Sequence, residues 1–168
     1  MGIFLWNSIC LGIFSAHAIL TANHFYTNIL KARGTFTPTK WDENTIVPIG
    51  ETQKITKASV ILAFGAAGEI AGNATVEWLM FYKYADEKDQ HNASAAFVGL
   101  MRFEGTLNGK SGSFVMEDRG TFDNGMLKAA LTILPGSGTG ELQNIGGTAK
   151  YESSSSTVDF EIEYDFNQ

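Results

Sequence analysis

One acidic residue stands on a strand face that is otherwise apolar. Asp118 follows Phe114 and Met116 at the two-residue spacing of a β-strand, so the three side chains are expected on the same side. A carboxylate on such a face loses hydration, and its pKa should rise unless a hydrogen-bond donor or water reaches it. Asp118 is therefore the first candidate for a group that moves a proton or anchors a ligand.

A structural interpretation of Asp118 competes with the functional one. Gly99, Gly105 and Gly120 lie on the same predicted face, and their missing side chains would leave space for a ligand. Alternatively, a bulge before Gly120 turns Asp118 to solvent, or the carboxylate is capped near the end of a barrel. Because perturbed acids are often structural, the sequence alone favours the second interpretation.

Other residue types that carry chemistry are scarce. Cys10 is the sole cysteine, and His91, in a charged loop, is the only histidine after residue 30, so neither a thiol or histidine metal site nor a catalytic triad is expected. Glu141, which follows the glycine-rich segment Pro135–Gly140, is the second candidate for moving a proton. The glycine-rich stretches lack the spacing of phosphate or dinucleotide loops. We expect no cofactor and no metal.

Two Asn-Gly pairs fix the strands that would position Asp118. Both central residues of a type I′ hairpin turn need positive φ, and Asn-Gly is the pair that adopts it most readily. Asn108-Gly109 sets Gly99 opposite Asp118, and Asn124-Gly125 sets Leu131 opposite the same residue. A one-residue slip would reverse every side chain, so the agreement of the two registers on one apolar face supports both. That face carries Phe97, Met101, Phe103, Phe114, Met116, Phe122, Leu127, Leu131 and Ile133.

The pattern of residues in the rest of the chain after residue 30 predicts short strands separated by turns. Strands are predicted over about 31–41, 54–64, 69–84 and 157–166, with one more ending near 152 and a loop over 42–53. Eight antiparallel strands can close into a barrel whose interior is filled or holds one small ligand. The predicted fold class is all-β: a single antiparallel, eight-stranded, calycin-like β-barrel over residues 31–168.

Residues 1–30 form an apolar N-terminal extension that contains no Lys, Arg, Asp or Glu. Three alternatives fit: a secretory signal cleaved near Ala16-His17-Ala18, a membrane anchor, or an upstream addition from a start codon placed too early. The protein would be cytoplasmic in the last case and exported or membrane-anchored in the others, with membrane contact only through residues 1–30. The net charge of −6 and the pI near 5.0 argue against a nucleic-acid partner.

Several short motifs follow one another in a particular order along the chain. They are Gly34-Thr35-Phe36, Trp41-Asp42-Glu43, Gly112-Ser113-Phe114-Val115, Gly120-Thr121-Phe122 and Pro135–Leu142. In these motifs and their order the chain resembles a bacterial family, the domain-of-unknown-function family 3224. The resemblance runs from about Ala32 to Phe166 and starts where the composition changes.

This resemblance implies a fold similar to the allene oxide cyclase and dirigent barrels, which bind apolar substrates in a hydrophobic lumen. Their Gly-Thr-Gly corner resembles Gly138-Thr139-Gly140. The family often carries Glu at the position of Met101 and His at the position of Asp118. The chain departs from that pattern at both positions, so a Glu/His chemistry would be lost or rearranged here.

Three functions follow as hypotheses. The first is a module that binds a small apolar ligand in the barrel lumen, with Asp118 as its charged anchor. The second is an isomerase or cyclase in which Asp118 or Glu141 moves a proton. The third is a structural or homo-oligomerising barrel with a filled interior. The residues expected to bind the ligand are Trp78, Met101, Phe103, Phe114, Asp118 and Tyr164.

Overall fold

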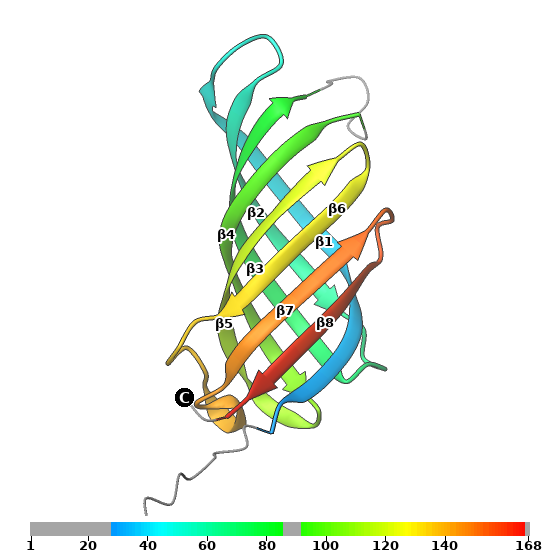
Figure 1. Cartoon of the computed structure of the whole chain (residues 1–168), viewed down its shortest axis with the longest axis vertical. Helices are drawn as coiled ribbons and strands as arrows, with labels where there is room; N and C mark the ends of the chain where they lie inside the picture. The colour runs from blue at the N-terminus through cyan, green and yellow to red at the C-terminus, as the bar shows by residue number, and fades with distance from the viewer. Residues whose placement is uncertain (1–27, 86–91, 167–168) are drawn as a thin grey trace, which may run out of the picture.

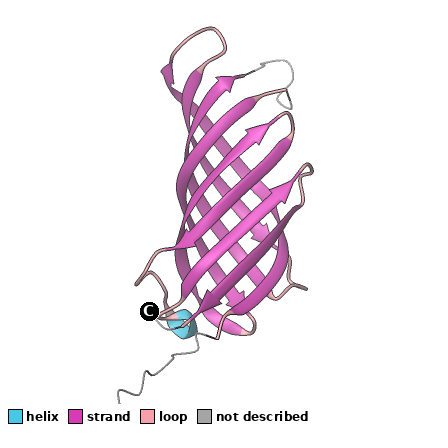
Figure 2. Ribbon diagram, viewed as in Figure 1, coloured by secondary structure: helices cyan, strands magenta, loops and turns pink. Residues whose placement is uncertain are grey.

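The computed structural model describes residues 28–85 and 92–166 of the 168-residue chain. Within these ranges, eight antiparallel strands form one sheet that closes into a barrel, because β1 pairs with β8 as well as with β2 (Figures 1 and 2). The predicted all-β, eight-stranded barrel is confirmed. The strands are β1 (Leu30–Pro48), β2 (Lys54–Phe64), β3 (Ile70–Tyr84), β4 (Ser94–Leu107), β5 (Lys110–Asp123), β6 (Met126–Ile133), β7 (Gly146–Ser153) and β8 (Val158–Asp165).

Both registers predicted from the Asn-Gly pairs are confirmed. Asp118 on β5 pairs with Gly99 on β4 and with Leu131 on β6. The turn residues have the positive φ of type I′ turns, 48° at Asn108 and 79° at Gly109, and similar values at Asn124-Gly125. The local turn chemistry therefore decides which side chains of β4, β5 and β6 face the interior.

Strand β1 is longer than the sequence predicted. The expected strand ended at Trp41 and a loop over 42–53 followed, but β1 continues to Pro48 and stays paired with β2. Pro48 and Gly50 suggested that loop, whereas pairing with β2 keeps the chain in the strand up to Pro48. A register shift between Pro38 and Lys40 re-aims the strand, so that Trp41 pairs with the buried Val60 and faces inward.

The two ends of the barrel differ. The connections β2–β3 and β4–β5 lie at one end, which we call the closed end, together with the short 3-10 helix η1 (Gly140–Leu142). Leu142 and Ile145 are fully buried there and belong to the core. The connections β1–β2 and β5–β6 lie at the other end, the open end, at the top of Figure 1, where Trp41 and other inward-facing side chains stay partly exposed.

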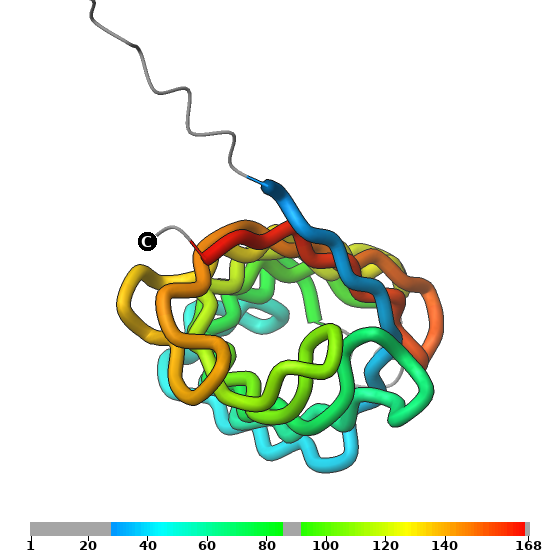
Figure 3. The backbone as a smooth tube through the Cα atoms, turned by 90° about the horizontal axis from the view of Figure 1, so that it is seen from below, coloured from blue at the N-terminus to red at the C-terminus, as the bar shows by residue number. Residues whose placement is uncertain are grey.

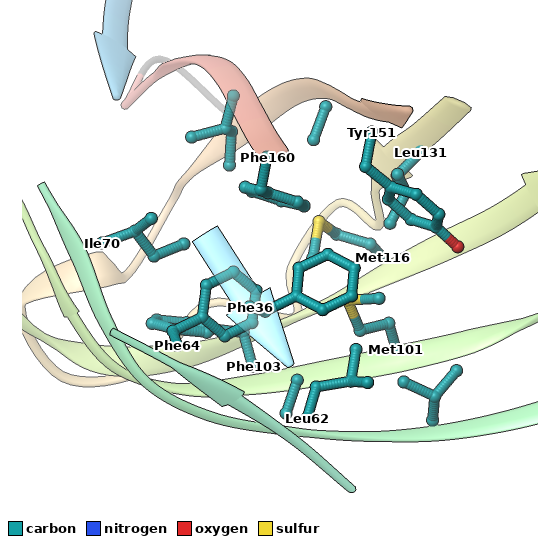
Figure 4. Close-up of a cluster of buried hydrophobic side chains, with 14 of the residues drawn as sticks. Phe36, Leu62, Phe64, Ile70, Met101, Phe103, Met116, Leu131, Tyr151 and Phe160 are labelled. Carbon is teal, nitrogen blue, oxygen red and sulfur yellow. The ribbon is translucent and has the colours of Figure 1, made fainter. Parts of the chain in front are cut away.

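Aromatic rings occupy the interior between these ends. Seen along the barrel, the strands form a closed ring (Figure 3), and the side chains in Figure 4 point from that ring toward one another. Phe36 contacts Phe64, Tyr151 and Phe160 at centroid distances of 5.3, 5.4 and 6.2 Å, and Phe64 contacts Phe103 at 5.4 Å. The middle of the lumen is thus a packed core.

No helix in the described ranges has the length and apolar character needed to cross a membrane. The expectations for residues 1–27 and for His91 lie outside the described residues.

Candidate functional site

Asp118 lies inside the barrel and has no exposed surface. Its Oδ2 accepts a hydrogen bond from Trp78 Nε1 at 2.8 Å, and the Tyr151 hydroxyl donates to Oδ1 and Oδ2 at 3.1 and 3.0 Å. The three side chains come from β3, β5 and β7, so alternate strands of the barrel meet at one carboxylate. The acid is on the predicted face and is neither turned to solvent nor capped at a barrel end.

Burial dominates the electrostatics of this site. Desolvation raises the pKa of Asp118 to about 6, although the hydrogen bonds from Trp78 and Tyr151 oppose the shift. Desolvation also raises the pKa of Tyr151, and the adjacent Asp118 carboxylate adds to that rise. Asp118 can therefore gain or lose a proton near neutral pH, although its side chain has no exposed surface in this conformation.

The glycines around Asp118 do not leave a cavity, and the expectation that they would is wrong. A Cβ on Gly99 would lie 2.0 Å from the Glu77 carbonyl oxygen and 2.7 Å from Trp78 Cδ1. A Cβ on Gly120 would lie 2.3 Å from Phe97 Cζ. The missing side chains allow close backbone approach and admit large aromatic rings, so the space beside Asp118 is filled by the protein itself.

An aromatic path leads from Asp118 toward the open end. Trp78, which donates to Asp118, contacts Phe97 and Trp41 at centroid distances of 5.2 and 5.6 Å. Trp78 is 5% exposed and Phe97 is 5% exposed, but Trp41 is 47% exposed. Trp41 is therefore an inward-facing indole that the protein leaves half uncovered.

A second carboxylate lies beside Trp41 at the open end. Glu43 Oε2 accepts a hydrogen bond from Trp41 Nε1 at 2.9 Å, and Glu43 Oε1 accepts one from Thr56 Oγ1 at 2.6 Å. Tyr82 also bonds Glu43, and its pKa is raised by burial and by that carboxylate. Lys54 Nζ lies 5.3 Å from the centroid of the Tyr82 ring. At the open end, hydrogen bonds thus hold the Glu43 carboxylate in place beside the exposed indole of Trp41.

The residues expected to bind a ligand are not all in one place. Trp78 and Asp118 are in direct contact. The rings of Phe103 and Phe114 pack against each other with their centroids 5.2 Å apart, and neither has exposed surface. Met101 is also fully buried and belongs to the same core. Tyr164 lies instead toward the closed end, where its hydroxyl accepts a hydrogen bond from Asn108 Nδ2 at 2.9 Å.

Glu141, the other candidate for moving a proton, is remote from Asp118. Its Oε2 accepts a hydrogen bond from the backbone N–H of Ser111 at 2.8 Å, which ties η1 to the start of β5. Ser111 and Asp118 are on the same strand, roughly 20 Å apart at the usual rise per residue. The structure therefore does not bring the two proton-transfer candidates together, and it gives Glu141 a structural contact.

Four residues of the site, Trp41, Glu43, Tyr82 and Tyr151, were absent from the expected site residues. Trp41 is the last residue of the strand predicted over 31–41, and Glu43 fell in the predicted loop. The stretch from Trp41 to Thr45 has no alternation of apolar and polar residues, so no local signal marked it as a strand. Tyr82 lay in the strand predicted over 69–84. Tyr151 lay in a recognised strand, but only barrel closure shows that its hydroxyl reaches Asp118. Among the described residues, no group of three or more His, Cys, Asp or Glu could hold a metal ion.

A surface depression of about 700 Å³ lies outside the lumen, over β5–β8 and the start of β1. Most of its charged side chains form ion pairs. Glu161 pairs with both Arg33 and Lys150, at 3.0 and 3.1 Å, and Lys128 pairs with Glu152 at 2.9 Å. A depression between long, ion-paired side chains is typical of the solvated face of an antiparallel sheet. We therefore place the candidate site at the open end and not here.

Comparison with known proteins gives a family and a fold. The model of a family described as proteins of unknown function, DUF3224, matches residues 32–164. A solved structure of a DUF3224-family protein with unknown function, from Shewanella oneidensis MR-1, is similar to this chain with a TM-score of 0.66 and 23% identity. The match covers 83% of this chain and 99% of the other. No curated protein matches the chain.

Proposed function

Because the chain belongs to the DUF3224 family, whose function is unknown, we propose its function from the geometry of the barrel: it binds a small, largely apolar molecule at the open end of the lumen. The observation that carries this proposal is the exposure of Trp41. This indole faces the interior, contacts the buried Trp78, and still leaves 47% of its surface uncovered. A ligand that covers Trp41 would remove apolar surface from water without displacing the packed core.

The ligand would have an apolar body and a polar end. Its body would lie against Trp41, and its polar end would reach the Glu43 and Tyr82 pair, which fixes orientation by hydrogen bonding. Asp118 would act indirectly. It accepts the hydrogen bond that fixes the Trp78 indole, and Trp78 in turn contacts Trp41. In this proposal Asp118 is a positioning residue and not the anchor that contacts the ligand.

Two other functions are weighed against this one. The packed middle of the lumen favours a structural barrel, in which the open end is only an incompletely covered core. The isomerase or cyclase hypothesis requires the lumen to open at Trp78 before a substrate reaches Asp118. The likeness to allene oxide cyclase and dirigent barrels stays a prediction, and it supports an apolar ligand without specifying one.

A neutral fluorescent probe tests the proposal. Titration of the full chain with N-phenyl-1-naphthylamine should give saturable enhancement of probe fluorescence and quenching of tryptophan emission. Trp41→Ala should weaken probe binding at least about tenfold, the loss expected when most of the contact with a large aromatic side chain is removed.

Ile61→Ala is the matched control, because Ile61 is also partly exposed but lies on the outer face of β2. It should leave the affinity for the probe unchanged. Equal probe affinity in the Trp41→Ala variant and the unmodified chain would contradict the proposal and favour the structural barrel.

A further inference from the structure

We propose that the outer face of β3 and β4 is the surface through which two copies of this chain form a two-fold dimer. Four large apolar side chains project outward there: Leu79, Phe81, Val98 and Leu100, which are 50%, 38%, 43% and 50% exposed. We call these four residues the apolar face. The inference is independent of ligand binding at the open end.

The strand register makes the apolar face continuous. Leu79 on β3 pairs directly with Val98 on β4, Phe81 follows Leu79 on the same side of β3, and Leu100 follows Val98 on the same side of β4. Side chains at these positions are neighbours in both directions of the sheet. Adjacent exposed apolar residues of this kind mark interaction surfaces, whereas single ones are ordinary.

Another part of the outer surface shows what a solvated face of this barrel looks like. On β7, β8 and the start of β1, charged side chains form cross-strand ion pairs, such as Lys31 with Glu163 and Arg33 with Glu161. Such residues are the usual outer face of an antiparallel sheet. The apolar face on β3 and β4 departs from that pattern, so this part of the surface is suited to a protein partner.

The charges around the apolar face favour a second copy as that partner. Lys57 and Glu77 form an ion pair at 3.1 Å on one side, and Glu117 and Arg119 form another at 3.1 Å on the other side. These two cations and two acids cancel, and Arg102, the next outward-facing residue after Leu100, is paired with Glu104 at 2.6 Å. This face therefore carries no excess of negative charge, although the whole chain carries a net charge of −6. Two copies would therefore repel each other least when they meet on this face.

The order of these charges also defines the direction of the two-fold axis. Val98 pairs with Arg119, and the next outward-facing row of the sheet pairs Leu100 with Glu117. An axis that runs across the strands, between these two rows, places each row over the other row of the second copy. Arg119 then faces the partner's Glu117, and Val98 faces the partner's Leu100. An axis along the strands would instead bring Lys57 near the partner's Arg119.

Sedimentation of the full chain at about 0.15 M salt tests the dimer. The unmodified chain should associate with increasing concentration, and Leu100→Glu should raise the dimer dissociation constant at least about tenfold by burying a charge in an apolar contact. Thr148→Glu makes a comparable charge change on the outer face of β7, away from the apolar face, and should leave association unchanged.

Charge reversal tests the axis. Arg119→Glu places like charges across the interface and should weaken the dimer about tenfold, while Glu117→Arg combined with Arg119→Glu restores the opposite pairing and should recover association. A chain that stays monomeric up to about 100 μM would overturn the proposal, since an interface of standard size would have associated. A dimer that Leu100→Glu leaves intact would overturn it as well, because the copies would then meet on another face.

Discussion

Asp118 and Glu43 are two carboxylates on the inner face of the same barrel, and they are held by similar donors. Each accepts a hydrogen bond from a tryptophan indole, Trp78 or Trp41, and each is bonded to a tyrosine, Tyr151 or Tyr82. They differ in what covers them: Asp118 has no exposed surface, whereas Glu43 is only partly covered at the open end.

The comparison shows that donors alone do not decide what a buried acid can do. At Asp118 the loss of hydration outweighs the hydrogen bonds, so its pKa rises to about 6. At Glu43 solvent remains in reach, because the side chain is only partly covered. The buried carboxylate of Asp118 therefore holds the Trp78 and Tyr151 side chains in place, whereas under the proposed function the partly exposed carboxylate of Glu43 would meet the ligand.

The largest expected difference between the packed layer at Asp118 and the open end is the loss of stability when a glycine in each is replaced by alanine. Gly99→Ala places a Cβ 2.0 Å from a backbone oxygen beside Trp78, so the strands must separate, and we expect a loss of about 3 kcal/mol or more in the free energy of unfolding. Gly50→Ala, in the loop between β1 and β2, meets only Gln53 Oε1 at 4.0 Å and should change stability by less than about 0.5 kcal/mol. Urea unfolding of both variants measures the contrast, and equal losses would contradict a tightly packed layer at Asp118.

The second difference is the dependence of stability on pH. The pKa of Asp118 is above its usual value in the folded state, so the folded chain binds more protons between about pH 4 and pH 6, and stability falls as pH rises through that window. Asp118→Asn keeps hydrogen-bonding atoms for Trp78 and Tyr151 but removes the charge. It should stabilise the protein at pH 8 by up to about 3 kcal/mol, the value of a rise from 3.8 to about 6, and should give no such gain at pH 4.

Glu43→Gln is the control for this prediction, and it should change stability by less than about 1 kcal/mol at pH 8. Thermal unfolding at the two pH values measures both variants. A gain from Asp118→Asn that is the same at pH 4 and pH 8 would show that the desolvated charge is not its cause.

The smallest of the three effects concerns the tyrosines. Tyr151→Phe removes a hydrogen bond to both oxygens of a buried carboxylate and should cost about 2 kcal/mol at pH 8. It should also raise the pKa of Asp118 further, so the pH window of destabilisation moves upward. Tyr82→Phe should cost less than about 1 kcal/mol, because solvent can replace its hydroxyl. Urea unfolding across pH 4–9 tests both, and a Tyr151→Phe profile with an unmoved midpoint would contradict the role of that hydrogen bond.

Much of the fold was predictable because its signals are local. The Asn-Gly pairs at 108–109 and 124–125 define turn geometry within two residues, and alternation of apolar and polar residues then sets the face of each strand. Prediction failed along β1, where Pro48 and Gly50 suggested that the residues from Asp42 onward form a loop. Their strand conformation depends on a partner, β2, and on a register shift that the sequence does not mark.

The sequence by itself determined that Asp118 shares a strand face with Phe114 and Met116, since a period of two and two turn dipeptides are enough to assign that side; it left open whether a bulge turns the carboxylate to solvent. Only the tertiary structure decided what surrounds it. Trp78 and Tyr151 are 40 and 33 residues away along the chain, and they meet Asp118 because β3, β5 and β7 converge once all eight strand pairings close the ring. The strand tilt and the register stagger of a closed barrel depend on all eight strand pairings together, so they cannot be predicted from any short stretch of sequence.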